Sequence, residues 1–163
     1  MKRLLILIVL VLPGCGDREP EQNREEILMQ VYVTGMLTDQ QAEFLGKFPK
    51  GRFGLNGLTA ITDAQAESLS KITSLSLNGL TSITDAQAEM LSKIEGTLYL
   101  SGLTSISDKQ AETLSRIKGL HLSDSCFEQI LSYQQKIVDK INVSGTIDDG
   151  QITILKSYKG GDL

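Results

Sequence analysis

The chain repeats itself about every 22 residues, and this period limits the fold more than any other feature. Apolar residues two positions apart recur at this interval, and most of these segments end in glycine. The segments begin at Val31, Phe53, Leu75, Leu98, Leu120 and Ile141. Such alternation is typical of short strands with one buried face. Because so short a unit cannot bury its apolar side alone, the sequence predicts that successive units stack around one continuous core.

A short helix is predicted between successive strands. The stretch Thr62–Ile72, with sequence TDAQAESLSKI, recurs almost unchanged at 84–94 and 107–117. In each copy a Thr or Ser precedes a Gln by three residues, the capping-box spacing that satisfies two backbone N–H groups at a helix start. Thr38 and Gln41 give a fourth copy. Apolar residues three apart then give each helix one stripe to bury.

The strand motif L-x-L followed by I-T-D-x-x-A-x-x-L resembles the leucine-rich repeat, in particular its helical, ribonuclease-inhibitor-like subtype. The resemblance implies an α/β fold, a short leucine-rich-repeat solenoid with a parallel sheet on one face and short helices on the other. It implies a repeat domain at 31–163 with about six repeats, of which the last two are degraded, as expected of capping repeats. The family usually places Asn three residues after the second strand leucine. Here those positions are Leu58, Leu80 and Leu103, so we expect no Asn ladder.

Residues 1–14 are predicted to be a secretory signal peptide. Lys2 and Arg3 precede the apolar run Leu4–Leu12, which at about 1.5 Å per residue is too short to span a hydrocarbon layer of about 30 Å. The run ends in Leu-Pro-Gly-Cys15, which resembles the lipobox of bacterial lipoproteins. That resemblance implies cleavage before Cys15 and fatty acylation of its thiol, by palmitate for example, at the cell membrane or outer membrane. A plain signal peptide with a stray thiol is the alternative.

Residues 15–30 are predicted to be the lipidated cysteine and a flexible acidic tether. The segment Gly16–Glu26 contains five acidic residues and two arginines, includes Pro20 and lacks aliphatic side chains. Such a segment cannot bury enough apolar surface to offset the entropy lost on ordering it. We therefore expect Cys15 to hold the exported chain at a membrane through this tether.

Composition disfavours several classes of function. The formal charge of -4 removes the long-range attraction to phosphate that drives non-specific nucleic-acid binding. One His, two Cys and no Trp leave few groups for metal binding, acid–base catalysis or base stacking. We expect no catalytic residue, metal, cofactor or nucleic-acid partner. A hydrolase that uses Cys126 with His121 is the alternative, although a buried spectator thiol is the simpler interpretation of Cys126.

The outward positions of the predicted strands form the candidate binding surface. Arrays of stacked repeats bind partners through their exposed faces, so the sequence predicts a non-catalytic module for an unknown protein partner. The expected ligand contacts are Tyr32, Asn56, Asn78, Tyr99, His121 and Asn142. A solvated sheet face without a ligand is the alternative interpretation.

A second hypothesis makes the chain a structural spacer or a self-assembling component of the cell envelope. The sequence ends at Gly160–Leu163, where a seventh strand would begin. An incompletely covered end of a sheet is a surface for pairing with another chain. The sequence leaves the oligomeric state, the ligand and the membrane leaflet open.

Overall fold

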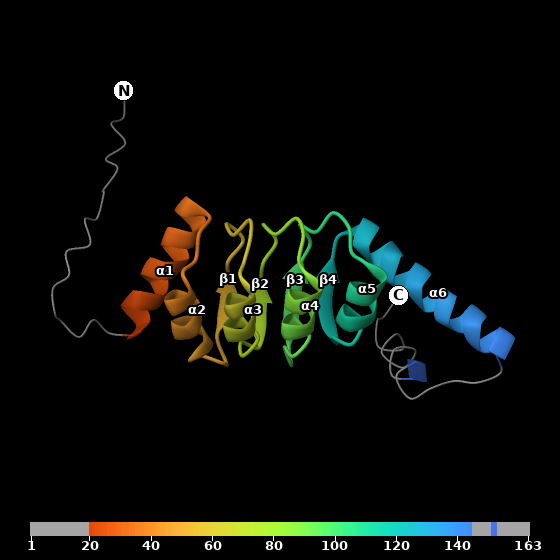
Figure 1. Cartoon of the computed structure of the whole chain (residues 1–163). Coiled ribbons are helices and arrows are strands. Elements are labelled where there is room, and N and C mark those ends of the chain that lie inside the picture. Colours follow the sequence, from red (N-terminus) through yellow and green to blue (C-terminus); the bar gives the residue numbers. More distant parts are fainter. Residues whose placement is uncertain (1–19, 145–150, 153–163) are drawn as a thin grey trace, which may run out of the picture.

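The computed structural model describes residues 20–144 and 151–152. The predicted signal segment, Cys15 and the predicted C-terminal self-association surface therefore lie outside the described residues. The described chain is an α/β arrangement with a four-stranded parallel sheet, as expected, and six helices (Figure 1). In chain order the elements are α1 (Pro20–Thr34), α2 (Asp39–Gly46), β1 (Arg52–Gly54), α3 (Asp63–Leu69), β2 (Ser74–Ser76), α4 (Asp85–Leu91), β3 (Thr97–Leu100), α5 (Asp108–Leu114), β4 (Gly119–Leu122) and α6 (Asp124–Ser144).

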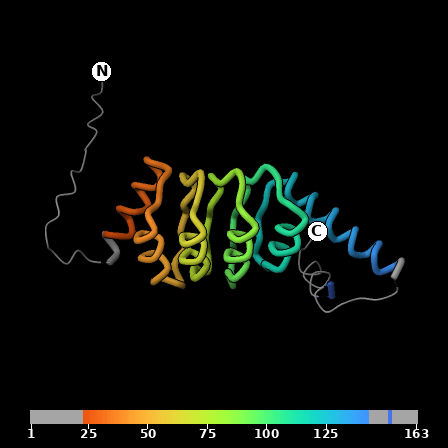
Figure 2. Tube along the Cα trace, in the orientation of Figure 1, coloured from red at the N-terminus to blue at the C-terminus, as the bar shows by residue number. Residues whose placement is uncertain are grey.

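Each unit of strand and helix lies beside the next unit along the chain. The strands follow one another in the order β1-β2-β3-β4, and Phe53, Leu75 and Leu98 occupy equivalent positions on three of them. The helices α2 to α5 contact one another in the same order on one side of the sheet. The result is a row of units with α1 at one end and α6 at the other (Figures 1 and 2). The 22-residue period therefore predicted the stacking correctly.

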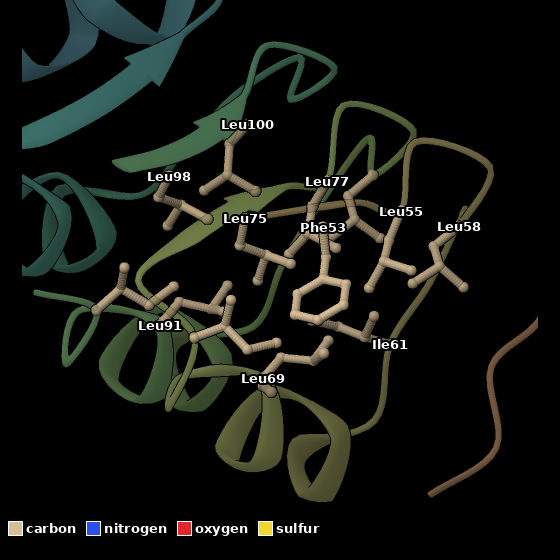
Figure 3. Close-up of a cluster of buried hydrophobic side chains, with 14 of the residues drawn as sticks. Phe53, Leu55, Leu58, Ile61, Leu69, Leu75, Leu77, Leu91, Leu98 and Leu100 are labelled. Atoms are coloured by element: carbon tan, nitrogen blue, oxygen red, sulfur yellow. The ribbon is translucent and has the colours of Figure 1, made fainter. Parts of the chain in front are cut away.

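The core fills the layer between the sheet and the helices. Leucines from strands and helices interdigitate there, and Leu75, Leu91 and Leu98 are fully buried (Figure 3). Leu58, Leu80 and Leu103 also point inward and are at most 1% exposed. Each apolar unit is thus covered by its neighbours rather than by its own residues, which is how stacked repeats bury a core.

The capping boxes predicted from the sequence are all present. Thr38, Thr62, Thr84 and Ser107 cap α2 to α5, and each accepts a hydrogen bond from the backbone N–H of the glutamine three residues later. Three of these glutamines are buried and also link neighbouring units. Gln65, Gln87 and Gln110 donate from Nε2 to the carbonyl oxygens of Leu37, Ile61 and Ile83, over 2.8, 2.8 and 2.9 Å. The same residue therefore starts a helix and joins two units.

The first and last predicted strands are wrong. The segment 31–35 ends α1, where Ile27 and Val31 are one helical turn apart and both buried against the row. Gly35 follows in the left-handed conformation (φ 67°), typical of a helix C-terminus. Residues 141–144 belong to α6, whose buried positions Cys126, Ile130 and Ile137 follow helical spacing. Helices therefore cover both ends of the sheet.

The prediction of a flexible tether at 15–30 also fails for residues 20–30, the part of it that the structure describes. α1 begins at Pro20, so residues 20–26 are helical although they carry many charges. A proline suits the first turn of a helix because its missing N–H has no partner there in any case. The apolar contacts of Ile27 and Val31, later in the same helix, supply the packing that the acidic segment lacks.

Candidate functional site

Four residues on the outward face of the sheet, one from each strand, form a row across it. The register aligns Gly54 with Ser76, Ser76 with Tyr99, and Tyr99 with His121. Neighbouring residues on the strands, such as Phe53, face the core, so this row points away from it. Tyr99 and His121 therefore occupy the outward strand positions that the sequence predicts, whereas their contact with a ligand stays a prediction.

Tyr32 and Asn142 do not belong to this row. Tyr32 lies on α1 with 79% of its surface exposed, and Asn142 is exposed near the end of α6. Both residues were assigned to strand positions because their neighbours alternate in the way that strands do. Since these segments are helical, the structure does not bring the two side chains onto the sheet face.

Tyr99 and His121 form the most distinctive feature of the sheet face. Their rings stack with centroids 4.4 Å apart and planes within 9° of parallel. Such a cross-strand aromatic pair contributes about 0.5 to 1.5 kcal/mol beyond its burial. Both side chains remain exposed, Tyr99 by 37%. We call this stacked and exposed pair the aromatic platform.

The other flank of Tyr99 is bordered by small residues. Ser76 is its neighbour on β2, and Gly54 follows on β1. A Cβ atom built on Gly54 would meet nothing closer than the Asn56 Nδ2 atom at 4.0 Å. The sheet face is therefore raised at Tyr99 and His121 and lower and more open at Ser76 and Gly54.

An asparagine ladder runs beside this row, contrary to the expectation that it is absent. Asn56 Oδ1 accepts from the backbone N–H of Asn78 at 3.1 Å and from Ser76 Oγ at 2.6 Å. Asn78 Oδ1 in turn accepts from the backbone N–H of Ser101 at 2.9 Å. The ladder lies two residues earlier than in the family pattern, because Leu58 and Leu80 occupy the later positions in the core. The carboxamide oxygens are used within the fold, so Asn56 and Asn78 offer a ligand their Nδ2 donors.

Cys126 and His121 stand in different environments. Cys126 is fully buried, and its Sγ donates to the Leu103 carbonyl oxygen at 3.4 Å. His121 is exposed and stacked on Tyr99. A thiol nucleophile needs access and an adjacent base, and this arrangement supplies neither to Cys126.

A polar cluster between α5 and α6 was not identified from the sequence. The hydroxyl of Tyr133 donates to Glu112 Oε2 at 3.1 Å, and Arg116 pairs with Oε1 of the same carboxylate at 3.0 Å. Burial, followed by the hydrogen bond to Glu112, raises the pKa of Tyr133 to about 12. Because Glu112 and Tyr133 lie 21 residues apart on separate helices, no local motif indicates their contact.

We expect Tyr133 to make the contact between α5 and α6 sensitive to alkali. The pKa of Tyr133 is 10.0 without the fold and about 12 within it, so its stabilising effect is complete below pH 10 and is lost as pH rises towards 12. Urea unfolding at a series of alkaline pH values measures this loss. In Tyr133→Phe the part of the loss between pH 10 and 12 should be smaller, and an unchanged profile would contradict the assignment.

Among residues 20–144 and 151–152, no group of His, Cys, Asp or Glu side chains is arranged to hold a metal ion. The helices described there are all too short or too polar to cross a bilayer. Searches of protein families, of curated proteins and of solved structures found no significant match to the chain.

Proposed function

We propose that the chain is a lipid-anchored protein of the cell envelope whose short leucine-rich-repeat solenoid binds another protein without catalysis. The observation that carries this proposal is the exposed Tyr99–His121 platform, set in a row on the sheet face. Rigid aromatic side chains are enriched among the residues that dominate protein–protein binding energy, because they bury a large area at a small entropic cost. The ladder of Asn56 and Asn78 adds hydrogen-bond donors beside the platform.

Three features support the assignment to a leucine-rich-repeat-like solenoid. The strands pair in parallel with each residue of the motif in register, the helices follow in sequence, and an Asn ladder, although two residues earlier than is usual in leucine-rich repeats, links successive units after β1 and β2. The inward leucines of successive units form one core. These features match the architecture that the motif resemblance implies.

The binding face is tested by capture from detergent-solubilised cell envelopes on the immobilised chain. We expect Tyr99→Ala and His121→Ala to weaken binding of the captured protein by roughly 30-fold each, the effect of losing a residue worth about 2 kcal/mol. Phe127→Ala is the matched control, since Phe127 is an exposed aromatic on α6 with 51% of its surface accessible. Equal capture by the Tyr99, His121 and control variants would reject the sheet face as the binding surface.

Anchoring is tested by metabolic labelling with a fatty acid. Cys15 directly follows the apolar run, so the wild-type chain should carry the label and Cys15→Ala should lose nearly all of it. The substituted chain should also move from the membrane to the soluble fraction, because no acyl chain then holds it. An unlabelled wild-type chain would refute lipidation, and label that persists in Cys15→Ala would place the acyl group elsewhere.

Light scattering of the solubilised chain distinguishes binding from self-assembly. A protein that acts through a separate partner remains monomeric as its concentration rises. Concentration-dependent growth in mass would instead favour the structural spacer or self-assembling component.

A further inference from the structure

Four large apolar side chains form an exposed stripe at one end of the molecule. Met29, Tyr32, Val33 and Met36 are 65, 79, 73 and 70% exposed. Their spacing places the first three on one face of α1, and Met36 follows just beyond its end. Ile27 and Val31 occupy the opposite face and are buried against the row of units. We call these four residues the α1 stripe; they are most of the exposed large apolar residues in the described part of the chain.

We propose that the α1 stripe lies on the lipid bilayer to which the chain is anchored. This inference rests on the acylation of Cys15 in the proposed function. Only four residues separate Cys15 from Pro20, where α1 begins. A fully extended chain spans at most about 3.6 Å per residue, so α1 starts within roughly 18 Å of the acyl chains. The helix therefore cannot leave the neighbourhood of the membrane surface.

The size of the α1 stripe favours a bilayer over a second copy of the chain. Four side chains of this kind, exposed to this extent, offer roughly 500 Å². A stable protein interface buries about 800 Å² on each partner. The bilayer has no such size requirement, because the anchor keeps the stripe at a high effective concentration beside it.

Two attachments would fix the orientation of the whole molecule. The anchor precedes the first turn of α1 and the stripe lies at its last turns, so both contacts together hold the helix along the membrane surface. Because α1 closes one end of the row, the units would then stack away from the membrane (Figure 1). The Tyr99–His121 platform would remain uncovered, with β1 and β2 between it and α1.

The absence of tryptophan from the chain permits a direct test. Tyr32→Trp places the single reporter on the α1 stripe, and Tyr99→Trp places one on the sheet face as a matched control. Each acylated chain is reconstituted into phosphatidylcholine vesicles that contain lipid with a quencher near the headgroup. An interfacial helix buries its apolar face about 5–10 Å, so the reporter at position 32 should lose roughly half of its emission. The reporter at position 99 should keep its emission.

Two further variants identify the stripe as the cause. In the Tyr32→Trp chain, Val33→Glu with Met36→Glu should restore most of the emission, whereas Phe127→Glu on α6 should change it little. Equal quenching at positions 32 and 99, or none at either, would overturn the proposal. Protection of the reporter together with crosslinking between copies would instead identify a second chain as the occupant, which also overturns it.

Failure of the anchor and failure of the stripe give different results. If fatty-acid labelling shows no acyl group on Cys15, the anchoring part of the proposed function is wrong. The quenching measurement is then repeated after coupling the Cys15 thiol to a maleimide phospholipid, since Cys126 is fully buried and shielded from the reagent. Quenching of the reporter at position 32 in this chemically anchored chain would support membrane contact by the α1 stripe. No quenching there would refute membrane contact.

Discussion

Replacing Gly102 with alanine should reduce the free energy of unfolding by about 3 kcal/mol, the upper part of the range for overpacking a close contact. A Cβ atom at this position would overlap the carbonyl oxygen of Asn78 and lie 2.8 Å from that of Leu80. Both oxygens belong to the backbone of the preceding unit, so no side-chain rotation relieves the overlap. The two units must separate, and this loosens leucine contacts on both sides. Urea unfolding followed by far-ultraviolet circular dichroism measures the loss.

Gly54→Ala is the matched control for this prediction. Gly54 also lies in the repeat, but an added Cβ atom there would meet only Asn56 Nδ2 at 4.0 Å. Alanine also restricts the unfolded chain, which stabilises a protein by about 0.4 to 1 kcal/mol where the native backbone accepts it. We therefore expect Gly54→Ala to change stability by less than about 1 kcal/mol. Similar losses for Gly54→Ala and Gly102→Ala would show that close approach between units is not the reason for glycine at position 102.

The repeat pattern alone does not show why residue 102 is glycine. From the sequence alone, glycine after a strand indicates a turn. In the structure its main purpose is the approach of one backbone to the next, as it is for Gly79, where an added Cβ would meet the carbonyl oxygens of Asn56 and Leu58. These contacts join residues 21 to 24 positions apart in the sequence, so only the stacked structure identifies the reason for glycine.

Elements with local signals could be predicted, and the ends of the row could not. The capping boxes at Thr62, Thr84 and Ser107 specify helix starts through residues three positions apart, and all of them form. The central strands likewise begin within two residues of the predicted positions. At residues 31–35 the same alternation is overridden, because Ile27 and Val31 gain more by covering the end of the sheet as one helical face. Propensity yields to tertiary packing in such segments.

The candidate site was likewise predictable in the central units and not at the ends of the row. The stacking of Tyr99 on His121 follows from the period of the repeat, which places them on neighbouring strands at the same level. Tyr32 does not lie on the sheet face, because the segment expected to be its strand belongs to α1. The predicted strand placed Val33 on its buried face, whereas Val33 is 73% exposed on α1 beside Met29 and Tyr32. The α1 stripe could therefore be identified only from the structure of the helix.

Replacing Gln87 with leucine should also lower the free energy of unfolding, by about 2–4 kcal/mol, because it leaves two polar groups of the backbone without a hydrogen-bond partner. Gln87 Oε1 accepts from the Thr84 N–H at 3.0 Å, and Nε2 donates to the Ile61 carbonyl oxygen at 2.8 Å. The side chain is 8% exposed, so water cannot replace it without opening the structure. Leucine has a similar volume and supplies neither bond. The expected loss therefore comes from unsatisfied hydrogen bonds and not from a cavity.

Gln41→Leu separates this linking role from helix capping alone. Gln41 forms the same capping box, with the Thr38 N–H at 2.9 Å from Oε1, but its Nε2 donates to the side chain of Gln30 and both bonds are exposed. Water can replace the lost partners there, so we expect Gln41→Leu to cost less than about 1 kcal/mol. Equal effects at positions 41 and 87 would assign the stability to capping. A larger effect at position 87 would show that the buried glutamines join one unit to the next, which a capping motif read from the sequence does not reveal.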